Sequence, residues 1–204
     1  MREQKPLKYT ALEGLSEKQL QEHHGVLYAG YVKKWNEIQE KLKTADRANP
    51  NGTFSELREL KLEETFALNG IKLHEGYFDG MGPGAATSGQ LPATSAIRKW
   101  IEEDFGSFEK WLEEFKAMGV AARGWAVLAM DLDDGRLYNI LCDSHNQGGV
   151  WNAVALLIMD VYEHAYFFDF ATARKAYIDV FVKNIDWAVA EAVAERFRLA
   201  EFRK

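Results

Sequence analysis

The 204-residue chain contains one cysteine, Cys142, so it cannot form an intramolecular disulfide bond. A chain without disulfides suits a reducing compartment. No apolar run approaches the roughly 18–20 residues that a membrane-spanning helix needs. The charged N-terminus, residues 1–9, also lacks the apolar segment of a secretory signal. These absences predict a cytoplasmic protein without a membrane partner.

Basic clusters are absent as well, and the net charge is −6. Because proteins that bind nucleic acid carry concentrated Lys and Arg, no nucleic-acid partner is expected. A small anionic substrate is compatible with this balance, since the local field can differ in sign from the net charge. The composition, with 47% hydrophobic and 27% charged residues, is that of an ordinary globular protein.

The N-terminal part of the chain has a purely helical pattern. Apolar residues recur every three or four positions from about residue 16 to 44, after a capping residue at Ser16, with an interruption expected near Asn36. The Asn-Pro-Asn-Gly sequence at 49–52 ends this segment, and a second helix is expected over 53–78. Two long helices joined by one turn predict an antiparallel hairpin.

The C-terminal part mixes helices and strands. We expect it to begin in the glycine-rich segment 80–89, which divides the chain into a helical domain of residues 1–86 and a second domain of residues 87–204. Its expected elements are helices over 93–104, 107–118, 164–183 and 186–203, and strands over 125–131, 136–141 and 153–160. Together the two parts predict an α+β fold.

Side chains that can bind a metal are few, since the chain has five histidines. Asp160 and His164 lie four residues apart where the last expected strand gives way to a helix, so both can reach one metal ion. His23 and His74 lie on the expected inner faces of the two N-terminal helices. Three imidazoles and one carboxylate suit iron, manganese, zinc, copper or nickel. The absence of thiolate ligands argues against an iron–sulfur cluster.

Each of these residues also has a simpler interpretation. A single histidine on an apolar helix face is more often a hydrogen-bonded core residue than a ligand. His24 competes with His23, because it lies one residue further along and about 100° around the helix. Asp160 can serve as the N-terminal cap of the helix that holds His164.

The order of motifs along the chain adds to this pattern. Residues 160–166, Asp-Val-Tyr-Glu-His-Ala-Tyr, resemble the D-x-[WF]-E-H-A-Y signature of the iron/manganese superoxide dismutases. The stretches around His23 and His74 are similar to the two ligand-bearing helices of that family, and Gly124 with Trp125 matches the G-W that opens its sheet. Further matches follow at Arg174, Tyr177, Asn184 and Trp187. The resemblance covers nearly the whole chain.

The resemblance implies an N-terminal two-helix antiparallel hairpin and a C-terminal α+β domain with a three-stranded antiparallel sheet. It also implies an enzyme that converts two superoxide anions to oxygen and hydrogen peroxide. One iron or manganese ion per subunit would be bound by His23, His74, Asp160 and His164, with a solvent molecule as fifth ligand. Zinc is excluded as the productive metal, because it has no accessible redox chemistry.

Residues around the ligands also receive roles from the resemblance. Tyr31 takes the place of the active-site tyrosine that gates the substrate path. Members of the family carry a Gln or a His that donates a hydrogen bond to the solvent ligand. Where that donor lies on the second helix, four residues before the ligand, this chain has Gly70. We therefore expect the donor to come from the loop at 144–147, as His145, with Gln147 as its competitor.

A homodimer is implied by the same resemblance. Glu163 would bridge to His164 of the other subunit in two symmetric copies, a geometry that fits a two-fold dimer. Trp125 would line the site, and Tyr166 completes the signature. A tetramer is also compatible with the sequence, which does not choose between iron and manganese.

Two positions depart from the family pattern. Leu27 stands where the family usually has a histidine, and Phe167 where it usually has a tyrosine that bonds to this histidine across the dimer interface. Losing one partner strands a polar group at a cost of roughly 1–3 kcal/mol, whereas replacing both by apolar groups can be nearly neutral. The paired change therefore indicates a retained interface. The missing relay motivates an alternative, a metal-binding protein with weak or no dismutase activity. Structural zinc binding is a third hypothesis.

Overall fold

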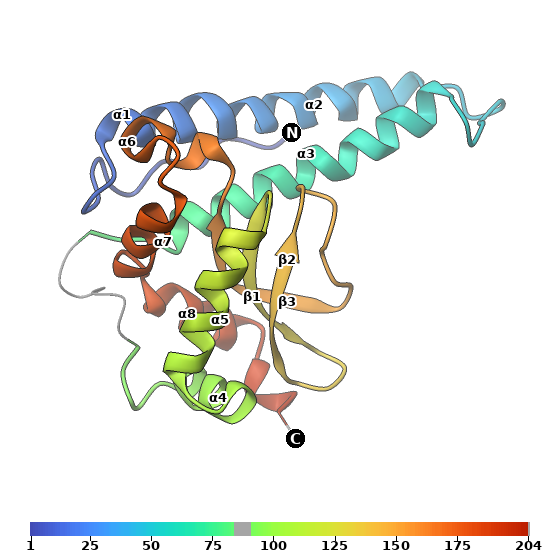
Figure 1. Cartoon of the computed structure of the whole chain (residues 1–204). Helices are drawn as coiled ribbons and strands as arrows, with labels where there is room; N and C mark the ends of the chain where they lie inside the picture. The colour runs from blue at the N-terminus through green and yellow to red at the C-terminus, as the bar shows by residue number, and fades with distance from the viewer. Residues whose placement is uncertain (84–90, 204) are drawn as a thin grey trace.

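The computed structural model describes residues 1–83 and 91–203. A long antiparallel pair of helices lies along one side of the molecule, and a three-stranded sheet with shorter helices forms the rest (Figure 1). This arrangement confirms the predicted α+β class. The predicted boundary between residues 86 and 87 lies outside the described residues. Within the described ranges, no helix combines the length and the apolar composition needed to span a bilayer.

The first arm of the hairpin is one continuous helix whose winding changes near its start. It consists of α1 (Glu17–Leu20), the π-helical segment η1 (Gln21–Tyr28) and α2 (Ala29–Thr44). Ser16 caps it as predicted, because its side-chain oxygen accepts a hydrogen bond from the backbone N–H of Gln19 at 3.1 Å. The π-helical segment carries His23 and His24, and such turns are frequent at functional sites.

The interruption expected near Asn36 is wrong, because α2 runs through this position. The Asn36 amide pairs instead with the backbone of Arg2, accepting from its N–H at 2.8 Å and donating to its carbonyl at 2.9 Å. These two bonds fasten the N-terminal segment along the helix without breaking it. The partner is distant in sequence, so the local pattern could not indicate it.

The second arm, α3 (Glu56–Asp79), packs alongside α2 (Figure 1). It begins later than residue 53, because the Asn51 side chain accepts hydrogen bonds from the N–H groups of Thr53 and Phe54 and holds a turn there. Ser55 is the cap in the structure. The buried face of α3 consists of Ala67, Gly70, Ile71, His74, Tyr77 and Phe78.

The sheet brings three chain segments together next to α3. β1 (Trp125–Asp131) is central, and β2 (Leu137–Cys142) and β3 (Ala153–Asp160) pair with it antiparallel on either side. The bounds of β1 and β3 match the prediction, and β2 is shifted by one residue. The register pairs Trp125 with both Cys142 and Asp160. The end of β3 therefore lies beside the start of β1 and near the loop that follows β2.

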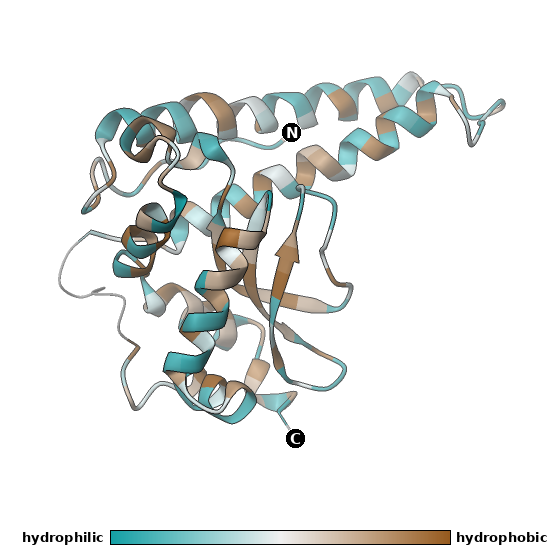
Figure 2. Cartoon of the chain, viewed as in Figure 1, coloured by the Kyte–Doolittle hydropathy of each residue, from teal (hydrophilic) through white to brown (hydrophobic). Residues whose placement is uncertain are grey.

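Shorter helices cover the sheet. α4 (Ala96–Phe105) and α5 (Phe108–Ala121) are capped by Ser95 and Ser107. α4 begins three residues after the predicted start, and α5 begins one residue after it. α5 packs against β1 and β2, and α8 (Trp187–Arg196) packs against β3. Figure 2 shows the strands as a brown, hydrophobic centre, with teal residues on the outer faces of the helices. The core therefore lies between the sheet and these helices.

The segment after β3 is not the continuous helix that the pattern over 164–183 predicts. It consists of the 3₁₀ turn η2 (Glu163–Ala165), α6 (Phe167–Phe170) and α7 (Arg174–Lys183). The break falls at Ala171, whose φ of 46° lies outside the right-handed helical region. The helix expected over 186–203 also ends early: α8 is followed by Arg198, with φ of 54°, and by the short turn η3 (Leu199–Glu201).

Hydrogen bonds to the first arm hold the irregular segment after β3 in place. The backbone N–H of Ser16 donates to the Asp169 carboxylate at 2.7 Å. The backbone N–H of Phe168 donates to the side-chain oxygen of Gln19 at 3.1 Å. These long-range bonds override the local helical pattern, and they bring the signature segment against the helix that carries His23.

Candidate metal centre

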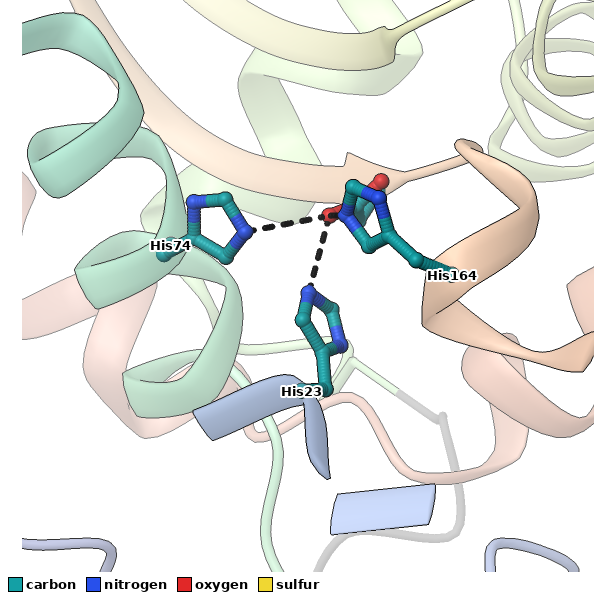
Figure 3. Close-up of side chains that lie close together, drawn as sticks. His23, His74 and His164 are labelled. Carbon is teal, nitrogen blue, oxygen red and sulfur yellow. Dashed lines mark hydrogen bonds and ion pairs between the residues drawn. The ribbon is translucent and has the colours of Figure 1, made fainter. Parts of the chain in front are cut away.

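Four elements bring the four predicted ligands to one point. His23 comes from η1, His74 from α3, Asp160 from the end of β3 and His164 from η2. One ligand atom from each residue lies within 4.8 Å of the corresponding atoms of the others. Figure 3 shows the rings of His23, His74 and His164 turned toward one another from three different segments. A set this narrow fits around one ion at ligand distances of about 2 Å.

The common centre of the cluster is one carboxylate oxygen. Asp160 Oδ2 lies 3.1 Å from Nε2 of His23, 3.3 Å from Nε2 of His164 and 3.6 Å from Nε2 of His74. The other oxygen, Oδ1, accepts a hydrogen bond from the backbone N–H of Tyr162 at 2.9 Å. Asp160 therefore holds the turn at Tyr162 with one oxygen and faces the three imidazoles with the other. It is not the N-terminal cap of η2, because the cap position is Tyr162 and no side chain caps this turn.

Burial leaves His23 and His74 as neutral imidazoles, whereas at His164 the charge and hydrogen bond of Asp160 outweigh burial and raise the pKa. Burial lowers the pKa of His23, and it lowers the pKa of His74 to about 3. Burial alone would raise the pKa of Asp160. The charge and hydrogen bond of His164, with those of His23, outweigh burial and hold that pKa far below its usual range. A buried carboxylate is costly unless a cation accompanies it.

His74 supplies a direct test of whether a metal fits. Its Nδ1 lies 2.6 Å from the carbonyl oxygen of Gly70 and donates to it, so its Nε2 carries a lone pair. This Nε2 is buried, and no group in the described part of the chain forms a hydrogen bond with it. A metal-bound histidine typically has its second nitrogen on a backbone carbonyl in this way. The nitrogen and oxygen donors here fit iron or manganese.

His145 lies beside the cluster, in the loop between β2 and β3, and is 4% exposed. The indole N–H of Trp125 donates to its Nδ1 at 3.0 Å. The centre of its ring lies 5.8 Å from the ring of His74. Gln147, the competing donor, is exposed at the surface of the same loop. The structure therefore brings His145 next to the candidate ligands and leaves Gln147 in solvent.

Tyr31 packs between the cluster and this loop. Its ring lies 5.2 Å from the ring of His74 and 4.7 Å, edge to face, from that of His145. Burial raises the pKa of Tyr31 to about 12, so the phenol stays protonated at neutral pH. Gly70 permits this packing, because a Cβ there would lie 2.9 Å from Cδ1 of Tyr31 and 3.2 Å from Cδ2 of His145.

His24, the competitor of His23, faces a different part of the molecule. Its Nε2 lies 3.0 Å from the carbonyl oxygen of Lys5, and its Nδ1 lies 3.2 Å from the side-chain nitrogen of Gln4. These contacts fasten the N-terminal segment onto η1. The four-residue cluster does not include His24.

The outer side of the cluster is open. The side chain of His164 is 27% exposed, and Glu163 is an exposed neighbour. Leu27 and Phe167, the two departures from the family pattern, are 36% and 49% exposed. Tyr166 is buried, and its hydroxyl accepts a hydrogen bond from Arg174 at 3.0 Å.

Some contacts around the cluster were not indicated by the sequence pattern. The Tyr177 hydroxyl donates to the carbonyl of Asp160 at 2.6 Å, and the side chain of Gln19 donates to the carbonyl of His164 at 2.6 Å. Phe66 packs on His145 with ring centres 4.5 Å apart. All three contacts join residues far apart in sequence, so local spacing carries no signal for them.

Comparison with known proteins agrees with this geometry. Residues 93–193 match the model of the C-terminal domain of the iron/manganese superoxide dismutases. An iron superoxide dismutase of Aquifex aeolicus (strain VF5) is 45% identical over 197 residues, which cover 95% of this chain and 89% of that protein. The chain belongs to the iron/manganese superoxide dismutase family.

Other superoxide dismutases similar to this chain are named for either metal. The iron superoxide dismutase of Cupriavidus metallidurans (strain ATCC 43123 / DSM 2839 / NBRC 102507 / CH34) is 38% identical over 97% of each chain. Manganese superoxide dismutase 1 of Halobacterium salinarum (strain ATCC 700922 / JCM 11081 / NRC-1) is 34% identical over 97% of this chain and 94% of that protein. Similarity therefore extends over the helical hairpin as well as the C-terminal domain.

Proposed function

We propose that the protein is a superoxide dismutase, which converts two superoxide anions and two protons to oxygen and hydrogen peroxide. One iron or manganese ion per subunit would be held by His23, His74, Asp160 and His164. The observation that carries the proposal is the convergence of three imidazole nitrogens on one buried carboxylate oxygen, in a chain of this family. The names of the relatives support the reaction, and they do not choose between iron and manganese.

The proposed ligands match the charge that the reaction needs. When bound, the metal supplies one-electron redox chemistry by alternating between its trivalent and divalent states. Asp160 contributes one negative charge, and neutral His23 and His74 contribute none. This set partly neutralises a trivalent ion and still leaves the site positive, which favours an anionic substrate.

Two residues beside the ligands would handle protons. We assign Tyr31 to hold a proton on its hydroxyl oxygen, since burial keeps this phenol protonated across neutral pH. His145 would donate a hydrogen bond from Nε2, which is buried without a hydrogen-bond partner among the described residues. The rings of Phe66 and Tyr162 pack around His145 and exclude bulk water from this side.

We infer that the functional unit is at least a two-fold dimer. Glu163 is exposed beside His164, and its side chain is available to reach His164 of a second copy. Two exposed phenylalanines, Phe167 and Phe168, follow directly in the chain. Leu27 is another exposed apolar residue, and an apolar pair of Leu27 and Phe167 suits a buried contact between copies. Sedimentation of the purified protein measures this state and separates a dimer from a tetramer.

The cytoplasm is the location that we propose. The one cysteine, Cys142, is a buried free thiol, which is compatible with a reducing compartment. Cell fractionation with a tagged protein tests this assignment.

Reconstitution with single metals tests the proposed reaction. Metal-stripped protein is loaded separately with iron, manganese and zinc, the bound metal is quantified, and superoxide decay is followed by stopped-flow absorbance. We expect fast decay with iron, with manganese or with both, and no enzymatic decay with zinc. Protein that is fully loaded with iron and with manganese but inactive in both forms would favour the alternative, a metal-binding protein without dismutase activity.

A further inference from the structure

We propose that Trp125 fixes His145 in the tautomer that carries its proton on Nε2, which makes this nitrogen an obligatory hydrogen-bond donor. The inference deepens the proposed function and rests on it for its chemical meaning. The tautomer itself can be measured without any turnover. In this account Trp125 is a positioning residue, because it acts on the site through His145.

The first step is the direction of one hydrogen bond. The indole nitrogen of Trp125 is a donor only, and it lies 3.0 Å from Nδ1 of His145. Trp125 is fully buried and His145 is nearly so. Nδ1 must therefore present a lone pair, and a neutral imidazole with a lone pair on Nδ1 carries its proton on Nε2.

The second step is the cost of the other tautomer. With the proton on Nδ1, the N–H groups of Trp125 and His145 would face each other in a buried place, with their nitrogen atoms 3.0 Å apart. The indole N–H would then have lost Nδ1 as its acceptor. The penalty for a buried donor without a partner is about 1 kcal/mol at its low end, which corresponds to about a fivefold preference. We therefore expect the Nε2 tautomer to be favoured by at least about fivefold.

The third step is that the ring cannot turn away. His145 contacts the rings of Phe66, Tyr31 and Tyr162, with centres 4.5, 4.7 and 5.4 Å away. The absence of a side chain at Gly70 allows these rings to pack this closely, because a Cβ at this position would be 3.2 Å from Cδ2 of His145. A flip of the imidazole would require these neighbours to move together, so the orientation that meets Trp125 is retained.

The fourth step is the backbone that holds the two partners. Trp125 begins β1, and Cys142, its neighbour in register on β2, precedes His145 by three residues. The backbone N–H of Gly124 donates to the carbonyl of Cys142 at 3.1 Å. A Cβ on Gly124 would lie 3.0 Å from that same carbonyl oxygen, so the two segments approach as closely as glycine allows. The distance between indole and imidazole is thus set by the sheet.

The consequence concerns the nitrogen beside the cluster. Nε2 of His145 is buried and has no hydrogen-bond partner in the part of the chain that the structure describes. With Nδ1 occupied by an indole donor, Nε2 can donate but cannot accept. A fixed donor favours an oxygen that carries negative charge, such as hydroxide, superoxide or peroxide, over a neutral hydrogen-bond donor. Trp125 thereby selects the kind of oxygen species that the site stabilises.

Neutron diffraction from crystals of the perdeuterated, metal-loaded protein tests this inference directly. We expect nuclear density for deuterium on Nε2 of His145, none on Nδ1, and the indole deuterium of Trp125 pointing at Nδ1. Deuterium on Nδ1, or an indole N–D that points elsewhere, would overturn the inference. The map of the unchanged protein decides this even where a variant fails to fold.

A pair of matched variants tests the role of the indole. Trp125→Phe removes the donor to His145. Trp111→Phe removes an equally buried indole that donates to Asn139, at the same distance of 3.0 Å. In Trp125→Phe we expect a mixture of both tautomers of His145, with partial deuterium occupancy on each nitrogen and the ratio of Nε2 to Nδ1 tautomer at least about fivefold lower. We also expect a shifted midpoint potential of the bound metal. Trp111→Phe should change neither property.

The same measurements separate this inference from the proposed reaction. A Trp125→Phe protein that keeps deuterium on Nε2 alone, with an unchanged potential, would contradict the role of Trp125. An unchanged protein with the expected tautomer but without dismutase activity would contradict the proposed function and leave the tautomer assignment intact.

Discussion

The inner and outer sides of the candidate metal centre differ in how their polar groups are held. On the inner side, Gly70 accepts from His74, and Trp125 donates to His145, so the chain itself fixes each ring. On the outer side, His164 is partly exposed and Glu163 lies at the surface. The inner half makes its contacts within one chain, whereas in the proposed dimer the exposed groups of the outer half would meet a second copy.

This difference indicates where sequence changes act. Substitutions on the inner side should disturb metal binding and proton handling in every subunit, whatever the assembly. Substitutions on the outer side should lower activity mainly by weakening the association between subunits.

Asp160→Ala should have the largest effect. It removes the anionic centre of the cluster, toward which His23 and His164 point at 3.1 and 3.3 Å. We expect bound iron or manganese to fall below about a tenth of a full equivalent and activity to fall at least about 100-fold, measured by elemental analysis and stopped-flow decay. Asp179→Ala is the control, since Asp179 is an exposed acid that pairs with Lys116. Full metal content in Asp160→Ala would contradict the ligand assignment.

Gly70→Ala tests the close packing on the inner side. The added Cβ would lie 2.9 Å from Tyr31 and 3.2 Å from His145, so activity should fall by about 10- to 100-fold through misplacement of these rings. Unfolding free energy should fall by about 1–2 kcal/mol, measured in denaturant. Gly30→Ala is the matched helical control, because a Cβ there meets no atom within 4 Å. The unfolding free energy of Gly30→Ala should rise by about 0.5–1 kcal/mol. Equal behaviour of the two variants would rule out a packing role for Gly70.

Phe167→Glu tests the outer side. A charge in an apolar contact between copies should weaken the dimer by at least about 100-fold. Activity should fall by about tenfold where Glu163 of a second copy is needed to hold His164. Phe197→Glu is the control, because Phe197 has a similar exposure, 47% against 49%, at the end of α8. Analytical ultracentrifugation over a range of concentrations measures the association of both variants. An unchanged association state in Phe167→Glu would contradict the assigned interface.

The Leu27→His, Phe167→Tyr double variant should have the smallest effect. Each single change places a polar group without a partner in the interface, which costs roughly 1–3 kcal/mol of dimer stability. The two together can bond to each other, so the double variant should recover most of that loss. We expect turnover within about threefold of the original protein. If the double variant loses as much dimer stability as the two single variants together, the two positions do not contact each other.

Elements with an unambiguous burial pattern could be predicted from the sequence. The bounds of β1 and β3 follow from their apolar runs, and the serine cap at Ser16 marks the start of the first helix. The break at Ala171 could not be predicted, because the Ser16–Asp169 hydrogen bond that accompanies it spans 153 residues. The π-helical winding of η1 also leaves no signal in apolar spacing.

The candidate site shows the same limit. The clustering of the four candidate ligands, with His145 beside them, could be predicted from spaced motifs and from the resemblance that these motifs carry. The bond from Trp125 to His145 could not, because it depends on strand register and on the path of the loop after β2. The packing of Phe66 on His145 depends on the same long-range geometry.

Anomalous diffraction at the iron and manganese edges, from crystals of the active protein as isolated, locates the bound metal and its ligands. We expect one peak per subunit, at the iron edge or the manganese edge, bonded to His23, His74, Asp160 and His164. Active crystals with no iron or manganese peak at this position, or with the peak bonded to other residues, would contradict the proposed metal centre.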